Sequence, residues 1–279
     1  MSKMRFIRIC ALAAPAIVGL SAAAPAHAFT YGTAYMTSWS GCDSSCSSAP
    51  SLSYTDDQIL MFEGAMNAYG HTHTHRYVNQ SVWASDLVED ENFGGHDNLY
   101  SDDGDVYAYS GHGSADAEGK TFQIPMCKKG STDSCWYNAE DSRFGERDTV
   151  YADVSPGKMR FMIYGTCFSV DKAPNYQWGQ AFWYGTDVVM GYRGVSADSE
   201  TTDEVMEDLV GEALGGAGDF KPSWFWAAED WWVDDTASIM ASGTDSTHAA
   251  TRRDNLDRTW GRRAATPHHD TFAWAWHEG

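Results

Sequence analysis

Short apolar runs and helix-like segments follow one another along the chain, and this order limits the folds that it can adopt. Three runs have the apolar character of strands that are buried on both faces: Asp105–Tyr109, Met159–Tyr164 and Asp187–Tyr192. Segments with helical spacing of apolar side chains precede and follow these runs. Strands that alternate with helices form a mostly parallel sheet with helices on both faces. The sequence therefore predicts an α/β fold.

The remaining elements are predicted from apolar periodicity and capping residues. The alternating stretch Tyr31–Trp39 predicts a first strand, and a capping box over Thr55–Gln58 predicts the start of a helix that ends at Gly70. Two more strands are expected at His73–Val78 and Thr271–His277. Further helical segments are expected at Trp83–Val88, Tyr176–Tyr184, Thr202–Leu214 and Ser223–Met240. No repeat and no long linker divides these elements, which predicts a single domain.

The first 28 residues have the features of a secretory signal peptide. Basic residues precede an apolar run, Ile9–Leu20, and Ala26-His27-Ala28 fits a cleavage site. The apolar run is too short to span a bilayer as a helix, and no other stretch is apolar for long enough. We therefore expect residues 29–279 to form one exported domain, secreted or periplasmic, with no membrane span once the signal is removed.

Composition argues against a disordered chain and against two kinds of partner. With 43% hydrophobic and 14% aromatic residues, the chain is too apolar to be disordered. Its 39 acidic residues outnumber its 19 basic ones, so the formal net charge is −20. Nucleic acids and anionic membranes attract positive surfaces, so neither is an expected partner.

Five cysteines remain when Cys10 leaves with the signal peptide. An odd number leaves at least one thiol unpaired within the chain, and export permits disulfides between the others. Sequence spacing alone does not determine the connectivity. We favour pairing between near neighbours, Cys42 with Cys46 and Cys127 with Cys135, which leaves Cys167 free.

His112 and Cys167 each follow one of the apolar runs. In an open parallel sheet, sites form beyond the carboxyl ends of the strands, and neighbouring strands lie about 4.8 Å apart. If the two runs are neighbours, the imidazole and the thiol can face each other. A thiolate that attacks and an imidazole that transfers protons form a nucleophilic pair. Glycines beside His112 leave room for a substrate and expose N–H groups that can stabilise an oxyanion.

Two blocks carry a resemblance to a known group: Val106-Tyr107-Ala108-Tyr109-Ser110-Gly111-His112-Gly113 and Phe161-Met162-Ile163-Tyr164-Gly165-Thr166-Cys167. This pattern resembles the clan of cysteine peptidases that includes caspases, legumain and gingipains, and also exported bacterial proteins of uncharacterised families. The resemblance implies a caspase-like three-layer α/β/α sandwich that hydrolyses peptide bonds without a cofactor. It implies that Cys167 is the nucleophile, that His112 is the catalytic histidine, and that the N–H groups of Gly113 and Cys167 form the oxyanion hole. Thr166 departs from the pattern, because the clan usually has Ala or Gly before the cysteine.

Two other functions are kept as alternatives. One is a catalytically inactive, exported binding module on the same fold, which would use its acidic face or its tryptophan-rich helix. The other is a metal-dependent hydrolase, because His71, His73 and His75 would share one face of a strand. A solvated polar edge is the structural interpretation of the same three histidines.

Three further clusters have a structural and a functional interpretation. The acidic turn Asp102-Asp103-Gly104-Asp105 is either a solvated turn or a structural calcium site. Four tryptophans at helical spacing either pack on the sheet or form a binding platform: Trp224, Trp226, Trp231 and Trp232. A basic stretch either pairs with the acidic body of the same chain or forms a mobile segment: Arg252, Arg253, Arg258, Arg262 and Arg263.

Overall fold

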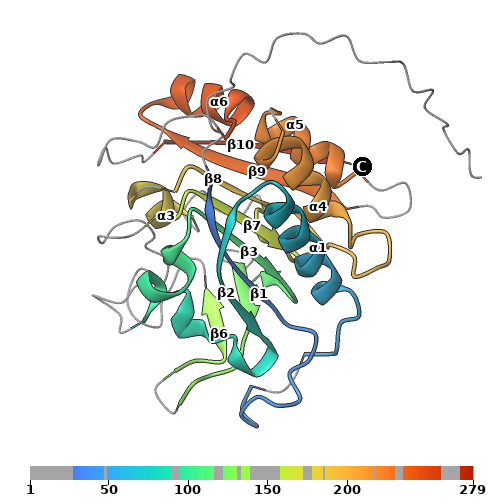
Figure 1. Cartoon of the computed structure of the whole chain (residues 1–279). Coiled ribbons are helices and arrows are strands. Elements are labelled where there is room, and N and C mark those ends of the chain that lie inside the picture. Colours follow the sequence, from blue (N-terminus) through green and yellow to red (C-terminus); the bar gives the residue numbers. More distant parts are fainter. Residues whose placement is uncertain are drawn as a thin grey trace, which may run out of the picture.

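The described part of the chain forms a seven-stranded sheet between two unequal layers (Figure 1). The computed structural model describes residues 28–46, 49–88, 95–115, 122–130, 133–138, 158–171, 178–184, 186–216, 218–229, 235–258 and 271–278. The expected signal peptide lies outside these residues except for Ala28. Within the described ranges, no helix is both long and apolar enough to cross a membrane.

The central sheet is mostly parallel, as predicted. In spatial order its strands are β2 (Thr72–Val78), β1 (Thr30–Tyr35), β3 (Val106–Ser110), β7 (Phe161–Gly165), β8 (Val188–Tyr192), β9 (Thr236–Gly243) and β10 (Thr271–Glu278). The first five run parallel to one another, β9 is antiparallel to β8, and β10 is antiparallel to β9. The three apolar runs predicted as buried strands correspond to β3, β7 and β8.

One face of the sheet is covered by helices. They are α1 (Thr55–Ala68), α4 (Val205–Leu209) with its π-helical continuation η5 (Val210–Leu214), α5 (Phe220–Ala227) and α6 (Ser246–Asn255). Phe62 of α1, Leu209 of α4 and Trp224 of α5 are fully buried and belong to the same core cluster as Ile163 of β7 and Met190 of β8. Burial of these apolar side chains holds the helical layer on the sheet.

The opposite face is covered mainly by short elements. They are a three-stranded sheet of β4 (Ser114–Ala115), β5 (Phe122–Pro125) and β6 (Trp136–Asn138), the helix α3 (Gly179–Tyr184), and the 3₁₀ helices η1 (Asn79–Ser81), η2 (Ala84–Asp86), η3 (Asp97–Leu99) and η4 (Ser101–Asp103). Phe122 and Ile124 alternate along β5 and pack into the second core cluster. The described residues therefore form an α/β sandwich, and the described part of its second layer consists mainly of 3₁₀ helices and short strands.

Two predicted elements have the wrong extent. The segment Ser223–Met240 is predicted as one helix, but α5 ends at Ala227 and β9 begins at Thr236. Nearly every residue of β9 is buried, and a continuous apolar run has no period that separates a strand from a helix. The first strand ends at Tyr35 rather than Trp39, because the N–H groups of Thr37 and Ser38 donate to the side-chain oxygen of Asn79 at 2.8 and 3.1 Å instead of continuing a ladder.

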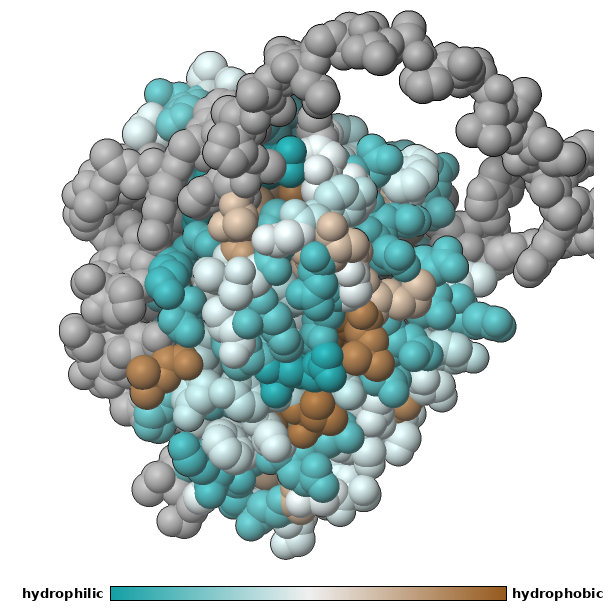
Figure 2. Space-filling model, in the orientation of Figure 1, coloured by the Kyte–Doolittle hydropathy of each residue, from teal (hydrophilic) through white to brown (hydrophobic). Residues whose placement is uncertain are grey.

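Helix α1 shows how sequence pattern and surface correspond. The side chains of Ile59, Phe62 and Met66 share one apolar face that is buried against the sheet, whereas Tyr69 lies beyond the last helical residue and is 50% exposed. The face of the molecule that carries α1 is mostly hydrophilic, with separate apolar patches rather than one continuous apolar surface (Figure 2).

Candidate active site

The strands that precede His112 and Cys167 are direct neighbours. β3 and β7 pair in parallel, and Ser110 is aligned with Gly165, so His112 and Cys167 each lie two residues beyond an aligned pair. The two apolar runs are therefore neighbouring strands, which is the condition under which the imidazole and the thiol can face each other. The turns after them also touch, because a Cβ atom on Gly113 would collide with the carbonyl oxygen of Cys167. Only glycine fits at position 113 while the two turns keep this approach.

The order of the sheet places His112 where ligands commonly bind in such folds. β1 lies between β2 and β3, so the chain leaves β1 toward one side of the sheet and leaves β3 toward the other. In open α/β sheets, ligands bind beyond the carboxyl ends of the strands at this kind of switch point. The loop after β1 and the turn that carries His112 both lie there.

The imidazole of His112 is held by two groups from the loop after β1. Nε2 lies 2.9 Å from the carbonyl oxygen of Pro50, and the ring lies against the indole of Trp39 with centroids 5.0 Å apart. Trp39 is buried, and its Nε1–H donates to the carbonyl oxygen of Pro125 at 2.9 Å. A carbonyl oxygen can only accept, so Nε2 carries a hydrogen in this contact, and in the neutral ring the lone pair is therefore on Nδ1. The geometry therefore favours the tautomer that makes Nδ1 a base.

Cys167 is the free cysteine among the described residues, and its side chain is half-buried. The backbone N–H of Ser196, in the segment after β8, points at Sγ with an N–S distance of 3.3 Å. Sγ also lies 3.6 Å from the carbonyl oxygen of Ser196, to which the thiol can donate, so the backbone of Ser196 fixes the position of the sulfur. The next residue, Phe168, has a φ of 60° and donates its N–H to the carbonyl oxygen of Gly194 at 2.7 Å. A bulky residue in the left-handed region marks a strained turn, which is a common feature of functional sites.

Thr166, the departure from the clan pattern, is fully buried. Its Oγ1 would lie 2.8 Å from a Cβ atom on Gly113, so the side chain packs beneath the turn that follows β3. Thr166 and the carbonyl oxygen of Cys167 thus both require glycine at position 113.

The residues that hold His112 and Cys167 were not predicted. Pro50 and Ser196 contribute a carbonyl oxygen and an N–H group, respectively. Every residue has a backbone carbonyl oxygen, and every residue except proline has a backbone N–H group. No side-chain type in the sequence therefore marks these positions. Trp39 was predicted, but as a strand residue.

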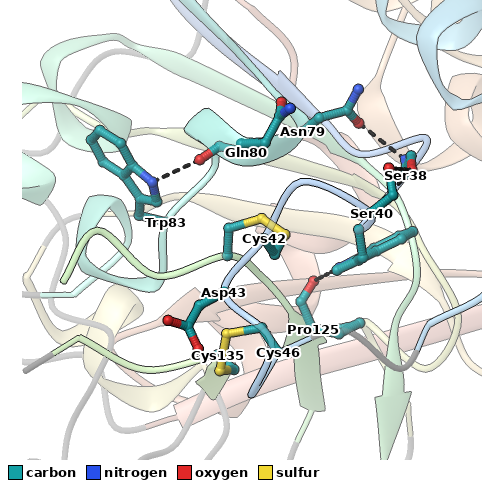
Figure 3. The surroundings of a disulfide bond; sticks show 12 residues. Ser38, Ser40, Cys42, Asp43, Cys46, Asn79, Gln80, Trp83, Pro125 and Cys135 are labelled. Atoms are coloured by element: carbon teal, nitrogen blue, oxygen red, sulfur yellow. Dashed lines mark hydrogen bonds between the residues drawn. A yellow bond between two sulfur atoms is a disulfide. The ribbon is translucent and has the colours of Figure 1, made fainter. Parts of the chain in front are cut away.

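Two disulfides fasten the loop after β1 to the small sheet (Figure 3). They join Cys42 to Cys127 and Cys46 to Cys135, with Cα atoms 5.0 Å apart in each pair. The predicted pairing of near neighbours, Cys42 with Cys46 and Cys127 with Cys135, is wrong. The loop lies against the connection between β5 and β6, so each of its cysteines meets a partner more than 80 residues away rather than the one nearby in sequence. The prediction that Cys167 is left unpaired is confirmed.

The three histidines near β2 do not form a metal site. Tyr31 pairs with His73, but Gly32 pairs with His75, so a bulge in β2 inserts one residue between them. His73 therefore stacks on Tyr31 beneath α1, whereas His75 lies over Gly32 on the opposite face, near Tyr107. The His71 ring accepts from the N–H of Phe29 and contacts the carbonyl oxygen of Leu214, each at 3.2 Å. Within the described ranges, no three His, Cys, Asp or Glu side chains are placed to hold a metal ion.

The carboxylates of the acidic turn before β3 accept hydrogen bonds from other parts of the chain. Asp102 accepts from the N–H groups of Lys158 and Met159 at 3.0 and 2.6 Å. Asp103 pairs with the Lys158 ammonium at 3.0 Å, and Asp105 accepts from the N–H of Thr30 at 2.9 Å. These bonds hold β1 and the segment just before β7 against the turn, which supports the structural interpretation of this cluster.

The tryptophan and arginine clusters are largely structural where the chain is described. Trp224 is buried and donates to the carbonyl oxygen of Gly191, whereas Trp226 is 55% exposed. Trp231, Trp232, Arg262 and Arg263 lie outside the described residues. Arg252 pairs with buried Asp187, Arg253 pairs with Asp254, and Arg258 donates to the carbonyl oxygens of Leu214 and Gly215. The described arginines thus bind their own chain, as one of the two interpretations expected.

Comparison with known proteins gives a family but no activity. No curated protein matches this chain. A family model described as a domain of unknown function (DUF6345) matches residues 38–278, a range that includes the loop after β1, His112 and Cys167. Because this match covers most of the sequence, the chain belongs to the DUF6345 family.

Proposed function

We propose that this protein is a cysteine peptidase in which Cys167 is the nucleophile and His112 is the general base and acid. One observation carries the proposal. The Nε2 atom of His112 is bound to the Pro50 carbonyl, which leaves Nδ1 as a proton acceptor in the turn beside a free, half-buried thiol. Nucleophilic cysteines are activated by an imidazole that a third group orients in this way.

The proposed reaction has two halves. The imidazole takes the proton of Cys167, and the thiolate attacks the carbonyl carbon of a peptide bond. The N–H groups of Gly113 and Cys167 stabilise the resulting oxyanion. The imidazolium then protonates the leaving amine as the C–N bond breaks, which leaves a thioester on Cys167. Water, deprotonated by His112, attacks the thioester and releases the carboxylate product and the free thiol.

A caspase-like arrangement is the finer proposal about the fold. Two observations support it: a mostly parallel sheet, and a histidine and a cysteine that follow neighbouring strands. Export to an oxidising compartment is likewise proposed, and the two disulfides support it.

Hydrolysis of a defined peptide mixture tests the function. The intact protein is incubated with peptides that represent every residue on the amino side of the cleaved bond, and the products are read by mass spectrometry. Cys167→Ala and His112→Ala should each lower the rate at least about 100-fold, whereas His248→Ala, on α6, should not change it. Cleavage that survives Cys167→Ala would contradict the proposal. If the wild-type protein cleaves nothing, the alternative of an inactive binding module is favoured instead.

A further inference from the structure

The segment from Gly194 to Thr202, here called the 194–202 loop, follows β8 and reaches both halves of the candidate site. At its start, Gly194 accepts from the N–H of Phe168, and the N–H of Ser196 points at the sulfur of Cys167. Another residue also holds the loop, because the Asp235 carboxylate, just before β9, accepts from the N–H of Ala197 at 2.9 Å. The position of the thiol is therefore tied to this loop.

Asp198 joins the 194–202 loop to the loop after β1. Its two carboxylate oxygens accept from the N–H groups of Ser53 and Tyr54 at 2.6 and 2.8 Å. Ser53 and Tyr54 follow closely after Pro50, whose carbonyl oxygen holds His112. One carboxylate thus connects the segment that contacts the thiol with the segment that orients the imidazole.

A second connection keeps the surrounding elements in place without Asp198. The Gln58 side chain donates to the carbonyl oxygen of Thr202 at 2.9 Å and accepts from the hydroxyl of Ser110 at 2.7 Å. The N–H of Leu52 also donates to the carbonyl oxygen of Thr37 at 2.9 Å. Loss of the Asp198 contacts should therefore shift the Pro50 segment locally and leave the fold intact.

We propose that Asp198 is a positioning residue of the candidate active site, which holds the Pro50 carbonyl against His112 while its own loop holds Cys167. This inference rests on the proposed function, since it assigns Asp198 a part in orienting the same imidazole. A carboxylate suits the role because it accepts two N–H bonds at once, and charge-assisted bonds are stronger than neutral ones. An amide at this position would turn one N–H₂ group toward a backbone N–H group, so Asp198→Asn breaks one of the two bonds with little change in volume.

The tautomer of His112 gives a readout that a purely structural role would not change. ¹⁵N NMR of histidine-labelled protein distinguishes a hydrogen on Nε2 from one on Nδ1, and His112→Ala assigns the signal. In the neutral ring of the wild type we expect the hydrogen on Nε2 alone. In Asp198→Asn we expect both tautomers, together with a fall of about 10-fold or more in the rate at which iodoacetamide alkylates Cys167 at pH 6.

Glu200→Gln is the matched control, because it removes the same charge from an exposed residue of the same loop. It should keep the wild-type tautomer and alkylation rate. Thermal unfolding is measured for every variant, and Asp198→Glu, which displaces the carboxylate by one methylene, replaces Asp198→Asn if the latter does not fold.

The two proposals fail in different ways. If His112→Ala slows alkylation but Asp198→Asn matches the wild type in tautomer and rate, the role of Asp198 is overturned and the proposed function stands. An equal fall in Glu200→Gln would overturn the role of Asp198 as well, since it would show an effect of charge alone. If His112→Ala alkylates as fast as the wild type, both proposals fall.

Discussion

Asp86 is a buried carboxyl group outside the candidate site whose proton links folding to pH. It is 3% exposed, and its Oδ2 accepts from the N–H of Trp83 at 3.2 Å. Burial raises the pKa of Asp86 from 3.8 to about 7, and the nearby charge of Asp133 adds to this rise. The folded state thus holds the proton more tightly than the unfolded state. The stability that the protonated Asp86 carboxyl contributes is complete below about pH 4 and is lost as the pH rises through about 7.

The Asp86→Asn variant should lose this pH dependence. Asparagine keeps an acceptor for the N–H of Trp83 but has no charge to bury. Between pH 5 and pH 8, the free energy of unfolding of the wild type should fall by on the order of 2 kcal/mol more than that of the variant. Urea unfolding at the two pH values measures this difference, with the partly exposed Asp56→Asn as control. Parallel pH dependence in wild type and Asp86→Asn would show that Asp86 is ionised in the folded state.

Side-chain chemistry decided which residues of the candidate site were predictable. His112 and Cys167 were predicted because few side chains act as base or nucleophile, and because parallel strands bring their carboxyl ends to one edge. Their backbone partners, Pro50 and Ser196, have no such mark. Asp198 lies just before the helical segment predicted at Thr202–Leu214, and no local pattern indicated that its carboxylate binds the distant residues Ser53 and Tyr54.

Among the secondary-structure elements, β7, β8 and α6 meet at a buried ionic junction. Asp187, just before β8, accepts from Nε of Arg160 at 2.9 Å and also pairs with Arg252 of α6. All three side chains are at most 4% exposed. Removing one member of a buried ion pair leaves its partners charged and without compensation, which costs far more than breaking an exposed pair.

Asp187→Ala should therefore destabilise the protein by about 3–5 kcal/mol. The comparison variant, Asp254→Ala, breaks pairs of Lys221 and Arg253 near the surface and should cost about 1 kcal/mol or less. Chemical unfolding followed by tryptophan fluorescence measures both. Similar losses in the two variants would mean that water reaches the junction around Asp187.

The disulfides stabilise the loop after β1 and, through it, the candidate site. Cys46→Ser/Cys135→Ser removes a cross-link between residues 89 apart and should lower the free energy of unfolding by about 2–4 kcal/mol. Because this loop carries Trp39 and Pro50, alkylation of Cys167 should also slow. Intact-mass kinetics on the double variant tests this, and an unchanged rate would show that the loop holds His112 without this disulfide. Cys42→Ser/Cys127→Ser tests the other cross-link in the same way.

The bounds of the buried strands were predicted best where a helix-like or polar segment separates the strand from the next apolar run. β3, β7 and β8 lie close to their predicted ranges, whereas β9 was merged with α5 because both are apolar and adjacent. The bulge in β2 was not predictable, since the Thr-His repeat fits a regular strand and only the pairing with β1 displaces His75 to the other face. There, burial lowers the pKa of His75 to about 4, so it does not respond to mild acid as a solvated histidine would.

On the scale of the whole molecule, the order of strands places the candidate site. Because the chain leaves β1 and β3 in opposite directions, the loop that carries Pro50 meets the turn that carries His112. Because β7 is the next strand, Cys167 follows beside it. The sequence predicted the mostly parallel sheet, and it predicted that the candidate site lies beyond the carboxyl ends of the strands. It did not predict that the loop after β1 crosses to the small sheet and is cross-linked there, because contacts between distant segments leave no local pattern.

The central claim is that His112 activates Cys167, and the rate of alkylation tests it most directly. Wild type and His112→Ala, both with intact disulfides, react with iodoacetamide at pH 6, and intact mass follows Cys167. We predict that the folded wild type reacts at least about 10-fold faster than the same thiol in urea, and that His112→Ala loses this advantage. A thiol that reacts only on unfolding, or equal rates in the two proteins, would contradict the claim.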